Sequence, residues 1–151
     1  RRLAITGPPG SGKTVLTVGL ILGLLENPAE GEAVPVRISA AFLDTEAIGP
    51  DTVDKRLITR LRQACRLKES TARTLVERRL VIPVIDGLDE MDPEEQLGCD
   101  RRAGRVIGAL NAYQDGRTKA TAVVACRIVH YRKLKELRVW VEDGAGDRLA
   151  G

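Results

Sequence analysis

A glycine-rich stretch near the start of the chain, GPPGSGKT, has the residue types and the spacing needed to bind phosphate groups. Its residues are Gly7, Pro8, Pro9, Gly10, Ser11, Gly12, Lys13 and Thr14. Together they match the pattern G-x-x-x-x-G-K-[ST] in full. The glycines let the backbone curl so that successive N–H groups point at phosphate oxygens. Lys13 supplies a positive charge for the β- and γ-phosphates, and the Thr14 hydroxyl can bind Mg²⁺. The stretch therefore predicts a site for a nucleoside triphosphate with its magnesium ion.

A block of acidic residues, DGLDEMDPEE, directly follows the hydrophobic segment from Leu80 to Ile85. Asp86, at the end of this segment, is placed to hold Mg²⁺ through a water molecule. Gly87 allows a sharp turn after Asp86, which would bring Asp89 and Glu90 back toward the phosphates. Glu90 is our candidate for the general base or water-positioning group, and Asp89 is a second candidate for metal binding or for the base. The block therefore predicts the carboxylates of a magnesium-dependent nucleotide site.

Other polar residues near this block have simpler interpretations. Asp92, Glu94 and Glu95 surround Pro93, and acids at the start of a helix favour its dipole and cap free N–H groups. His130, the only histidine, is expected on the surface of a helix and is assigned no role.

Arg127 follows a second apolar segment, TAVVAC. An arginine at the carboxyl end of a strand beside a phosphate loop can report whether a third phosphate is present. The alternative is that Arg127 forms an ion pair with the acidic block.

Strand-like and helical segments alternate along the chain, and these elements must position the candidate residues. The expected strands are Leu3 to Thr6, Val34 to Leu43, Leu80 to Ile85, Thr121 to Cys126 and Leu137 to Glu142. The expected helices are Lys13 to Glu26, Thr52 to Leu67, Pro93 to Tyr113 and Ile128 to Glu136. This alternation predicts an α/β fold with a parallel sheet, in which ligands bind beyond the carboxyl ends of the strands. Pro83 conflicts with a central strand because it cannot donate to a ladder. Either the regular pairing there is short, or Pro83 sits where its neighbour needs no donor.

The composition describes a globular chain with little overall charge bias. The 151 residues are 43% hydrophobic and 30% charged, and we expect them to form a single domain of a longer protein. The net charge of +3 is too small to indicate nucleic-acid binding, and the basic stretch from Lys55 to Arg79 is interpreted as a solvated helical face. The longest apolar stretch, from Val15 to Leu25, is far shorter than the ~20 residues that span a bilayer.

The three cysteines, Cys65, Cys99 and Cys126, lack the spacing of metal or redox sites. Cys65 and Cys126 are expected as small core residues. This cysteine usage predicts a reducing, cytoplasmic setting.

The pairing of GPPGSGKT with DGLDE after a hydrophobic strand resembles the NACHT domains of the STAND class of signal-transduction NTPases. The resemblance spans about Leu3 to Arg132 and is greatest for bacterial members, where a proline in the preceding strand is common. It implies a P-loop NTPase α/β/α sandwich with a five-stranded parallel sheet in the order 5-1-4-3-2. It also implies that Arg127 contacts the γ-phosphate, although the threonine of the family's T-[SC]-R pattern is replaced here by Ala125.

The function implied by the resemblance is a switch. The domain would bind ATP or ADP with Mg²⁺, hydrolyse ATP slowly, and control the oligomerisation of a larger signalling protein in bacterial conflict and antiviral defence. Adenine is favoured only because the guanine-reading pattern N-K-x-D is absent.

Three other functions remain open at the level of sequence. An AAA+-like motor subunit would need an arginine finger from a neighbouring subunit, for which no candidate stands out. A small-molecule P-loop kinase would usually carry an arginine-rich lid and lack the DGLDE block. A nucleotide-dependent scaffold without turnover is the third alternative.

Overall fold

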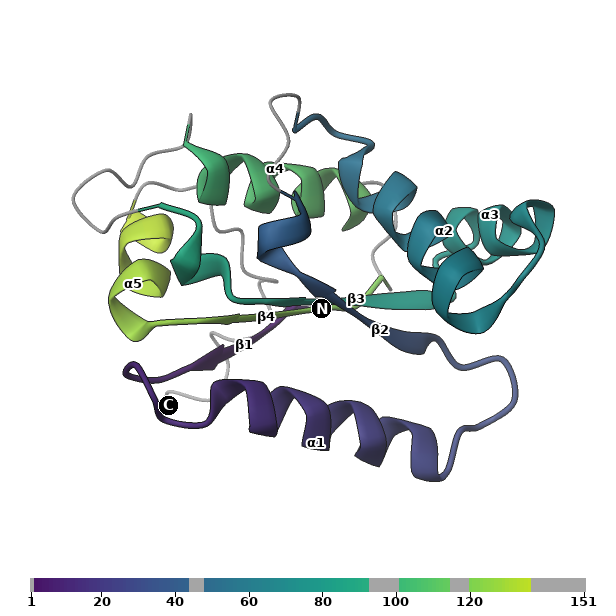
Figure 1. Ribbon diagram of the computed structural model, residues 1–151, viewed down its shortest axis with the longest axis horizontal. Helices are drawn as coiled ribbons and strands as arrows, with labels where there is room; N and C mark the ends of the chain where they lie inside the picture. Colours follow the sequence, from purple (N-terminus) through teal and green to yellow (C-terminus); the bar gives the residue numbers. More distant parts are fainter. Residues whose placement is uncertain (1, 44–47, 93–100, 115–119, 137–151) are drawn as a thin grey trace, which may run out of the picture.

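The computed structural model describes residues 2–43, 48–92, 101–114 and 120–136, and in this part of the chain four strands form one parallel sheet (Figure 1). The strands are β1 (Arg2–Thr6), β2 (Val34–Ser39), β3 (Val81–Asp86) and β4 (Ala122–Cys126). Their order in the sheet is β1-β4-β3-β2. The predicted parallel α/β fold is therefore confirmed. The described sheet has four strands and not the predicted five, and the segment predicted as the fifth, Leu137 to Glu142, lies outside the described residues.

Helices cover both faces of the sheet. They are α1 (Lys13–Glu26), α2 (Thr52–Cys65), α3 (Glu69–Glu77), α4 (Arg102–Gln114) and α5 (Ile128–Glu136). Two short 3₁₀ helices, η1 (Ala40–Leu43) and η2 (Leu88–Glu90), follow β2 and β3 directly. In Figure 1, α1 lies along one face of the sheet, and α2, α3 and α4 lie on the other. The bounds of α1 and α5 agree with the predicted ones.

The basic stretch from Lys55 to Arg79 folds as two helices, whereas we expected only the first of them. Helix α2 buries Val53, Leu57 and Leu61 at helical spacing. It ends at Cys65. The C-cap residue Arg66 has a left-handed φ of 53°, and the chain turns there toward α3. Helix α3 was missed because its short, polar sequence ESTARTLVE buries only Ala72 and Val76.

Pro83 is accommodated because the pairing of β3 with β4 is short. The register of β3 with β2 runs along the whole strand and includes Pro83 opposite Val36. The register with β4 includes only Val84 and Ile85, which follow the proline. The first of the two explanations offered for Pro83 therefore holds on the β4 side, whereas on the β2 side Pro83 lies within the register.

The core lies between the sheet and the helices α2, α3 and α4. Every residue of β4 is buried, including Cys126, as predicted for this cysteine. Cys65 is exposed at the end of α2, so its prediction as a core residue was wrong. Cys65 is the last residue of α2, directly before the left-handed residue Arg66, and its side chain lies on the solvent side of the helix end. Cys99 lies outside the described residues.

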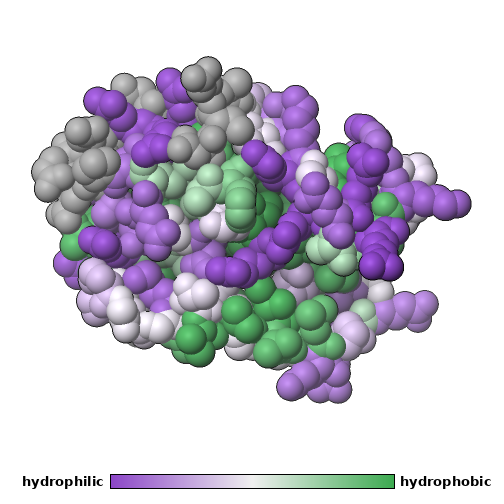
Figure 2. Space-filling model, viewed as in Figure 1, coloured by the Kyte–Doolittle hydropathy of each residue, from purple (hydrophilic) through white to green (hydrophobic). Residues whose placement is uncertain are grey.

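Helix α1 exposes much of its apolar surface. Figure 2 shows this surface as a continuous hydrophobic patch along the α1 side of the molecule. The exposed large apolar side chains of α1 are Val15, Leu16, Val18, Leu22, Leu24 and Leu25. Thr17 is the only buried residue of this helix. No helix in the described part of the chain is long and apolar enough to cross a membrane.

Candidate functional site

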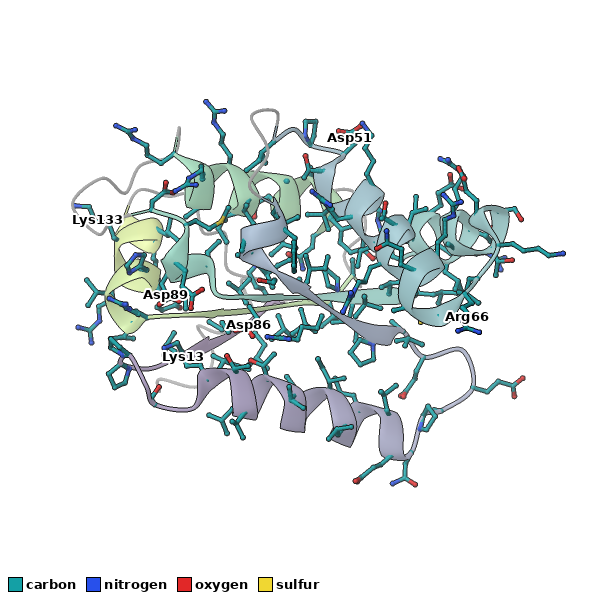
Figure 3. The ribbon with its side chains drawn as sticks, viewed as in Figure 1. Lys13, Asp51, Arg66, Asp86, Asp89 and Lys133 are labelled. Carbon is teal, nitrogen blue, oxygen red and sulfur yellow. The ribbon has the colours of Figure 1, made fainter. Side chains whose placement is uncertain are left out.

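One cavity of about 370 Å³ brings the two predicted motifs together at the carboxyl ends of the strands. Its lining residues are Pro9, Gly10, Ser11, Gly12, Lys13, Thr14, Asp86, Gly87, Asp89, Glu90 and Arg127. Figure 3 shows Lys13, Asp86 and Asp89 at the same end of the sheet. Gly7 and Pro8 do not line the cavity, but they contribute backbone atoms to the loop. These residues meet because β1, β4 and β3 are neighbours in the sheet, so the segments after them share one edge.

The phosphate loop has the backbone conformation that its glycines permit. Gly10 and Gly12 have φ values of 72° and 80°, which other residues rarely adopt. The Ser11 N–H donates to the Pro8 carbonyl at 3.2 Å and closes a turn. Gly12 occupies the N-cap of α1, where no side chain caps the helix. The first N–H groups of α1 are therefore available to an anion in the cavity.

The Lys13 ammonium group is held by the loop. It donates to the carbonyl oxygens of Pro8 at 3.0 Å and Gly7 at 3.3 Å. The Thr17 hydroxyl donates in turn to the Lys13 carbonyl at 2.8 Å, which anchors the first turn of α1. A Cβ atom at Gly7 would lie 2.5 Å from the Ser11 Oγ, so a larger residue there would require the Ser11 side chain to move. The loop thus holds a positive charge beside the helix N-terminus.

Asp86 is paired with an arginine that the sequence analysis did not identify. Arg37 of β2 donates to one carboxylate oxygen of Asp86, from Nε at 3.1 Å and from Nη2 at 2.6 Å. The Asp86 side chain is only 7% exposed, whereas that of Arg37 is 42% exposed. The available signal was the charged Arg37 in the mainly apolar strand VPVRIS, next to a strand that ends in an acid.

Asp89 is paired with Arg127, which is the alternative role considered for this arginine. The Arg127 Nε donates to an Asp89 carboxylate oxygen at 3.0 Å. The Asp89 side chain is 7% exposed and the Arg127 side chain is 41% exposed. This contact leaves the predicted role at the γ-phosphate untested, since Arg127 also lines the cavity.

Glu90 is brought to the cavity by a turn at Gly87. Gly87 has a φ of 79°, and its carbonyl accepts a hydrogen bond from the Glu90 N–H at 3.0 Å. This is the sharp turn predicted from the glycine. Glu90 is exposed, and its carboxylate makes no ion pair with any residue that the structure describes. Of the three acids at the cavity, Glu90 is therefore the one accessible to a water molecule.

Asp92 caps a helix, as predicted, although the described helix begins at Arg102. One Asp92 carboxylate oxygen accepts from the Ala103 N–H at 2.7 Å, and the other accepts from Arg102 Nε at 3.2 Å. Glu94 and Glu95 lie outside the described residues.

His130 is buried, so its predicted place on a helix surface was wrong. Its side of α5 faces inward, and Nε2 lies 3.3 Å from the Asp92 carbonyl oxygen. Nδ1 has no partner among the residues that the structure describes. Leu134, four residues later on the same face of α5, is also buried.

Burial and the charged residues of the site change the pKa of Cys126, the last residue of β4. Burial raises the pKa of the Cys126 thiol from 9.0 to about 12. The negative charge of Asp89 contributes to this rise in pKa, and the positive charge of Lys13 opposes it. The thiol of Cys126 is therefore neutral at ordinary pH.

The oxygen ligands present fit Mg²⁺ bound together with phosphates. Mg²⁺ keeps several waters and commonly takes one or two protein ligands beside phosphate oxygens. At the cavity, Thr14 could supply a direct ligand and Asp86 could hold one of the waters. Within the described ranges, no group of three or more His, Cys, Asp or Glu side chains could hold a metal ion without a nucleotide.

Searches against protein-family models, curated proteins and solved structures found no match to this chain.

Proposed function

We propose that this domain is a nucleotide switch of the NACHT type that binds ATP with Mg²⁺ and hydrolyses it slowly. The observation that carries the proposal is the single cavity lined by the phosphate loop, by three carboxylates and by Arg127. If GPPGSGKT were only a glycine-rich turn before a helix, there would be no reason for carboxylates that follow a different strand to line the same cavity. The finer form of the fold, a P-loop sandwich whose fifth strand lies beside β1, belongs to the same proposal.

Each residue would have one task in binding. The loop N–H groups and Lys13 would hold the phosphates, since Lys13 already lies over the loop. Thr14 would bind Mg²⁺ directly, and Asp86 would hold one of its waters. Mg²⁺ would neutralise the charge that develops on the phosphates.

The chemical step would depend on Glu90. Its accessible carboxylate would orient a water molecule and accept its proton. Asp89 is less suited to this task because Arg127 occupies its carboxylate. Arg127 would contact the γ-phosphate and, in this proposal, give up its contact with Asp89.

Self-association of the domain, in the service of a larger signalling protein, is part of this proposal. Its support is the exposed apolar surface of α1, because contiguous apolar patches of this kind mark contacts with other protein surfaces. A role in bacterial defence rests on the resemblance of the two motifs to NACHT domains.

The test separates binding from turnover. Calorimetry should detect binding of ATP with Mg²⁺ to the wild-type domain, and Lys13→Ala should abolish it. Lys68→Ala, an exposed lysine at the start of α3, is the matched control and should bind normally. Absence of ATP binding to the wild-type domain would refute the proposal.

Turnover is measured by release of phosphate over many hours, because slow hydrolysis is expected. Glu90→Gln should keep ATP affinity and stop release, whereas Glu77→Gln, an exposed glutamate at the end of α3, should change neither. Unchanged release by Glu90→Gln would remove Glu90 from its role. Transfer of phosphate to an added metabolite would instead support a kinase, and turnover only in a ring-shaped assembly would support an AAA+-like motor.

A further inference from the structure

A second cavity is lined by residues that are all different from those that line the nucleotide site. It has a volume of about 200 Å³ and is formed by β2, η1 and α2. The polar and aromatic side chains that line it are Arg37, Ser39, Phe42, Arg56, Thr59, Arg60 and Gln63. We call it the arginine pocket. Its volume is below the range of about 300–1,000 Å³ typical of drug-sized ligands, so it suits a small group.

The charge of the arginine pocket is wholly positive among its described lining residues. Three guanidinium groups line it, and no carboxylate does. Arg56 and Arg60 are four residues apart on α2, a spacing at which like charges repel and destabilise a helix. An anion bound between the two guanidinium groups would remove this repulsion.

The other basic residues of α2 provide the contrast. Lys55 pairs with Asp51, and Arg62 pairs with Glu69 at 3.1 Å. Arg56 and Arg60 make no ion pair with any residue in the described ranges. Of the three arginines that line the pocket, Arg37 pairs with Asp86, and Arg56 and Arg60 are the two whose charge no described carboxylate compensates.

Phe42 adds an apolar surface to these charges. Its side chain is 69% exposed at the pocket, which is unusual for a large aromatic residue in a chain that contains so few. An aromatic ring beside guanidinium groups recognises a ligand with one anionic end and one flat or apolar end.

We propose that the arginine pocket binds a small phosphate ester, with its phosphate on Arg37, Arg56 and Arg60 and its apolar part against Phe42. Arg37 connects the arginine pocket to the nucleotide site, since it lines the pocket and also donates to the Asp86 carboxylate. A phosphate in the pocket competes with Asp86 for this guanidinium. Binding in the pocket therefore releases Asp86 for the water shell of Mg²⁺ and favours nucleotide binding. By reciprocity, Mg²⁺ and nucleotide favour binding in the pocket.

The pocket is tested without the nucleotide site, in the Lys13→Ala variant. Phenyl phosphate is titrated while amide chemical shifts are followed by NMR. Saturable shifts in β2, η1 and α2 are expected, and Arg56→Gln and Arg60→Gln should each weaken binding by about tenfold, equivalent to 1.4 kcal/mol. Arg62→Gln, on the same helix but outside the pocket, is the matched control and should leave affinity unchanged. Benzoate should bind more weakly and phenol should not bind.

Two results would overturn the pocket. One is the absence of saturable binding of phenyl phosphate. The other is an equal loss of affinity in Arg62→Gln, which would show attraction to the general charge of α2.

The coupling through Arg37 rests on the proposed nucleotide function and is measured in the domain with Lys13 intact. A fluorescent ATP analogue reports the Mg²⁺ concentration needed for half-maximal binding. Phenyl phosphate should lower this midpoint by about fivefold, as expected for the loss of roughly 1 kcal/mol from a partly exposed ion pair. Arg37→Gln should lower the midpoint without phenyl phosphate and remove its effect.

The outcomes of the two experiments are distinguishable. A raised midpoint would mean that phenyl phosphate competes at the phosphate loop, and a shift that persists in Arg37→Gln would refute the role of this arginine. If the domain binds no nucleotide, the proposed function fails, while phenyl phosphate binding to the Lys13→Ala variant still supports the pocket.

Discussion

Replacing Arg127 by glutamine should destabilise the protein more than replacing Asp89 by asparagine. The two side chains form an ion pair at 3.0 Å, but their environments differ: Asp89 is 7% exposed and Arg127 is 41% exposed. Without Arg127, a poorly hydrated carboxylate loses its partner. A fully buried charge in this position would cost about 3–5 kcal/mol, and access of water from the Arg127 side reduces our expectation to about 1–2 kcal/mol. Without Asp89, the arginine can turn to solvent, so that Asp89→Asn should cost about 1 kcal/mol or less.

The assay is urea denaturation of the two single variants and the double variant, followed by circular dichroism. The double-mutant cycle should give a coupling energy of about 1 kcal/mol. The control is the surface pair of Arg73 and Glu69, which is 3.1 Å apart and about half exposed on both sides, and which should give at most about 0.5 kcal/mol. A coupling energy for Arg127 and Asp89 no larger than that of the control would refute the reasoning.

The same cycle tests the second role of Arg127. If Arg127 moves to the γ-phosphate, a non-hydrolysable ATP analogue with Mg²⁺ should lower its coupling to Asp89, and ADP should not. Equal coupling in the presence of both nucleotides would assign Arg127 to the ion pair alone.

Three further perturbations test the phosphate loop and the core. Gly12→Ala should cost about 1–2 kcal/mol in urea denaturation and weaken ATP binding, because Gly12 has a φ of 80° that alanine tolerates poorly. At pH 8, iodoacetamide should label Cys65 and spare Cys126, whose pKa is about 12, and equal labelling by peptide mass spectrometry would contradict the burial of β4. Tyr113→Phe should lose about 1 kcal/mol at neutral pH, since Tyr113 donates to the Val81 carbonyl at 2.6 Å. Burial raises the pKa of Tyr113 from 10.0 to about 12, so the unfolded chain ionises first and stability falls as pH rises through this range. Tyr113→Phe should reduce that fall, and an unchanged slope would refute it.

The gathering of the candidate residues could be predicted because it follows from parallel strands alone. Lys13 comes after β1, Asp86 ends β3 and Arg127 follows β4. Once these strands are parallel, their carboxyl ends share one edge, whatever the side chains do. The ends of α1 were likewise set by local signals, the phosphate loop before it and the Asn27-Pro28 pair after it.

The partners of the acids could not be predicted in the same way. Arg37 meets Asp86 only because β2 is the neighbour of β3, with Ser39 in register with Asp86. That register depends on the packing of the whole sheet and leaves no local pattern. The burial of His130 has a similar origin, since it depends on where α5 packs and on the position of the Asp92 carbonyl.

The two ion pairs give the proposed switch a physical form. Asp86 is held by an arginine from β2, and Asp89 by an arginine that follows β4. The protein thus neutralises both poorly hydrated carboxylates with its own cations. Mg²⁺ and the γ-phosphate carry the charges that would replace these contacts, the first at Asp86 and the second at Arg127. If the proposed function holds, nucleotide binding replaces two ion pairs within the protein by two ionic contacts with the bound Mg²⁺ and γ-phosphate. The difference in free energy is then small compared with the strength of either set, and this is the condition under which a phosphate can shift a protein between two states.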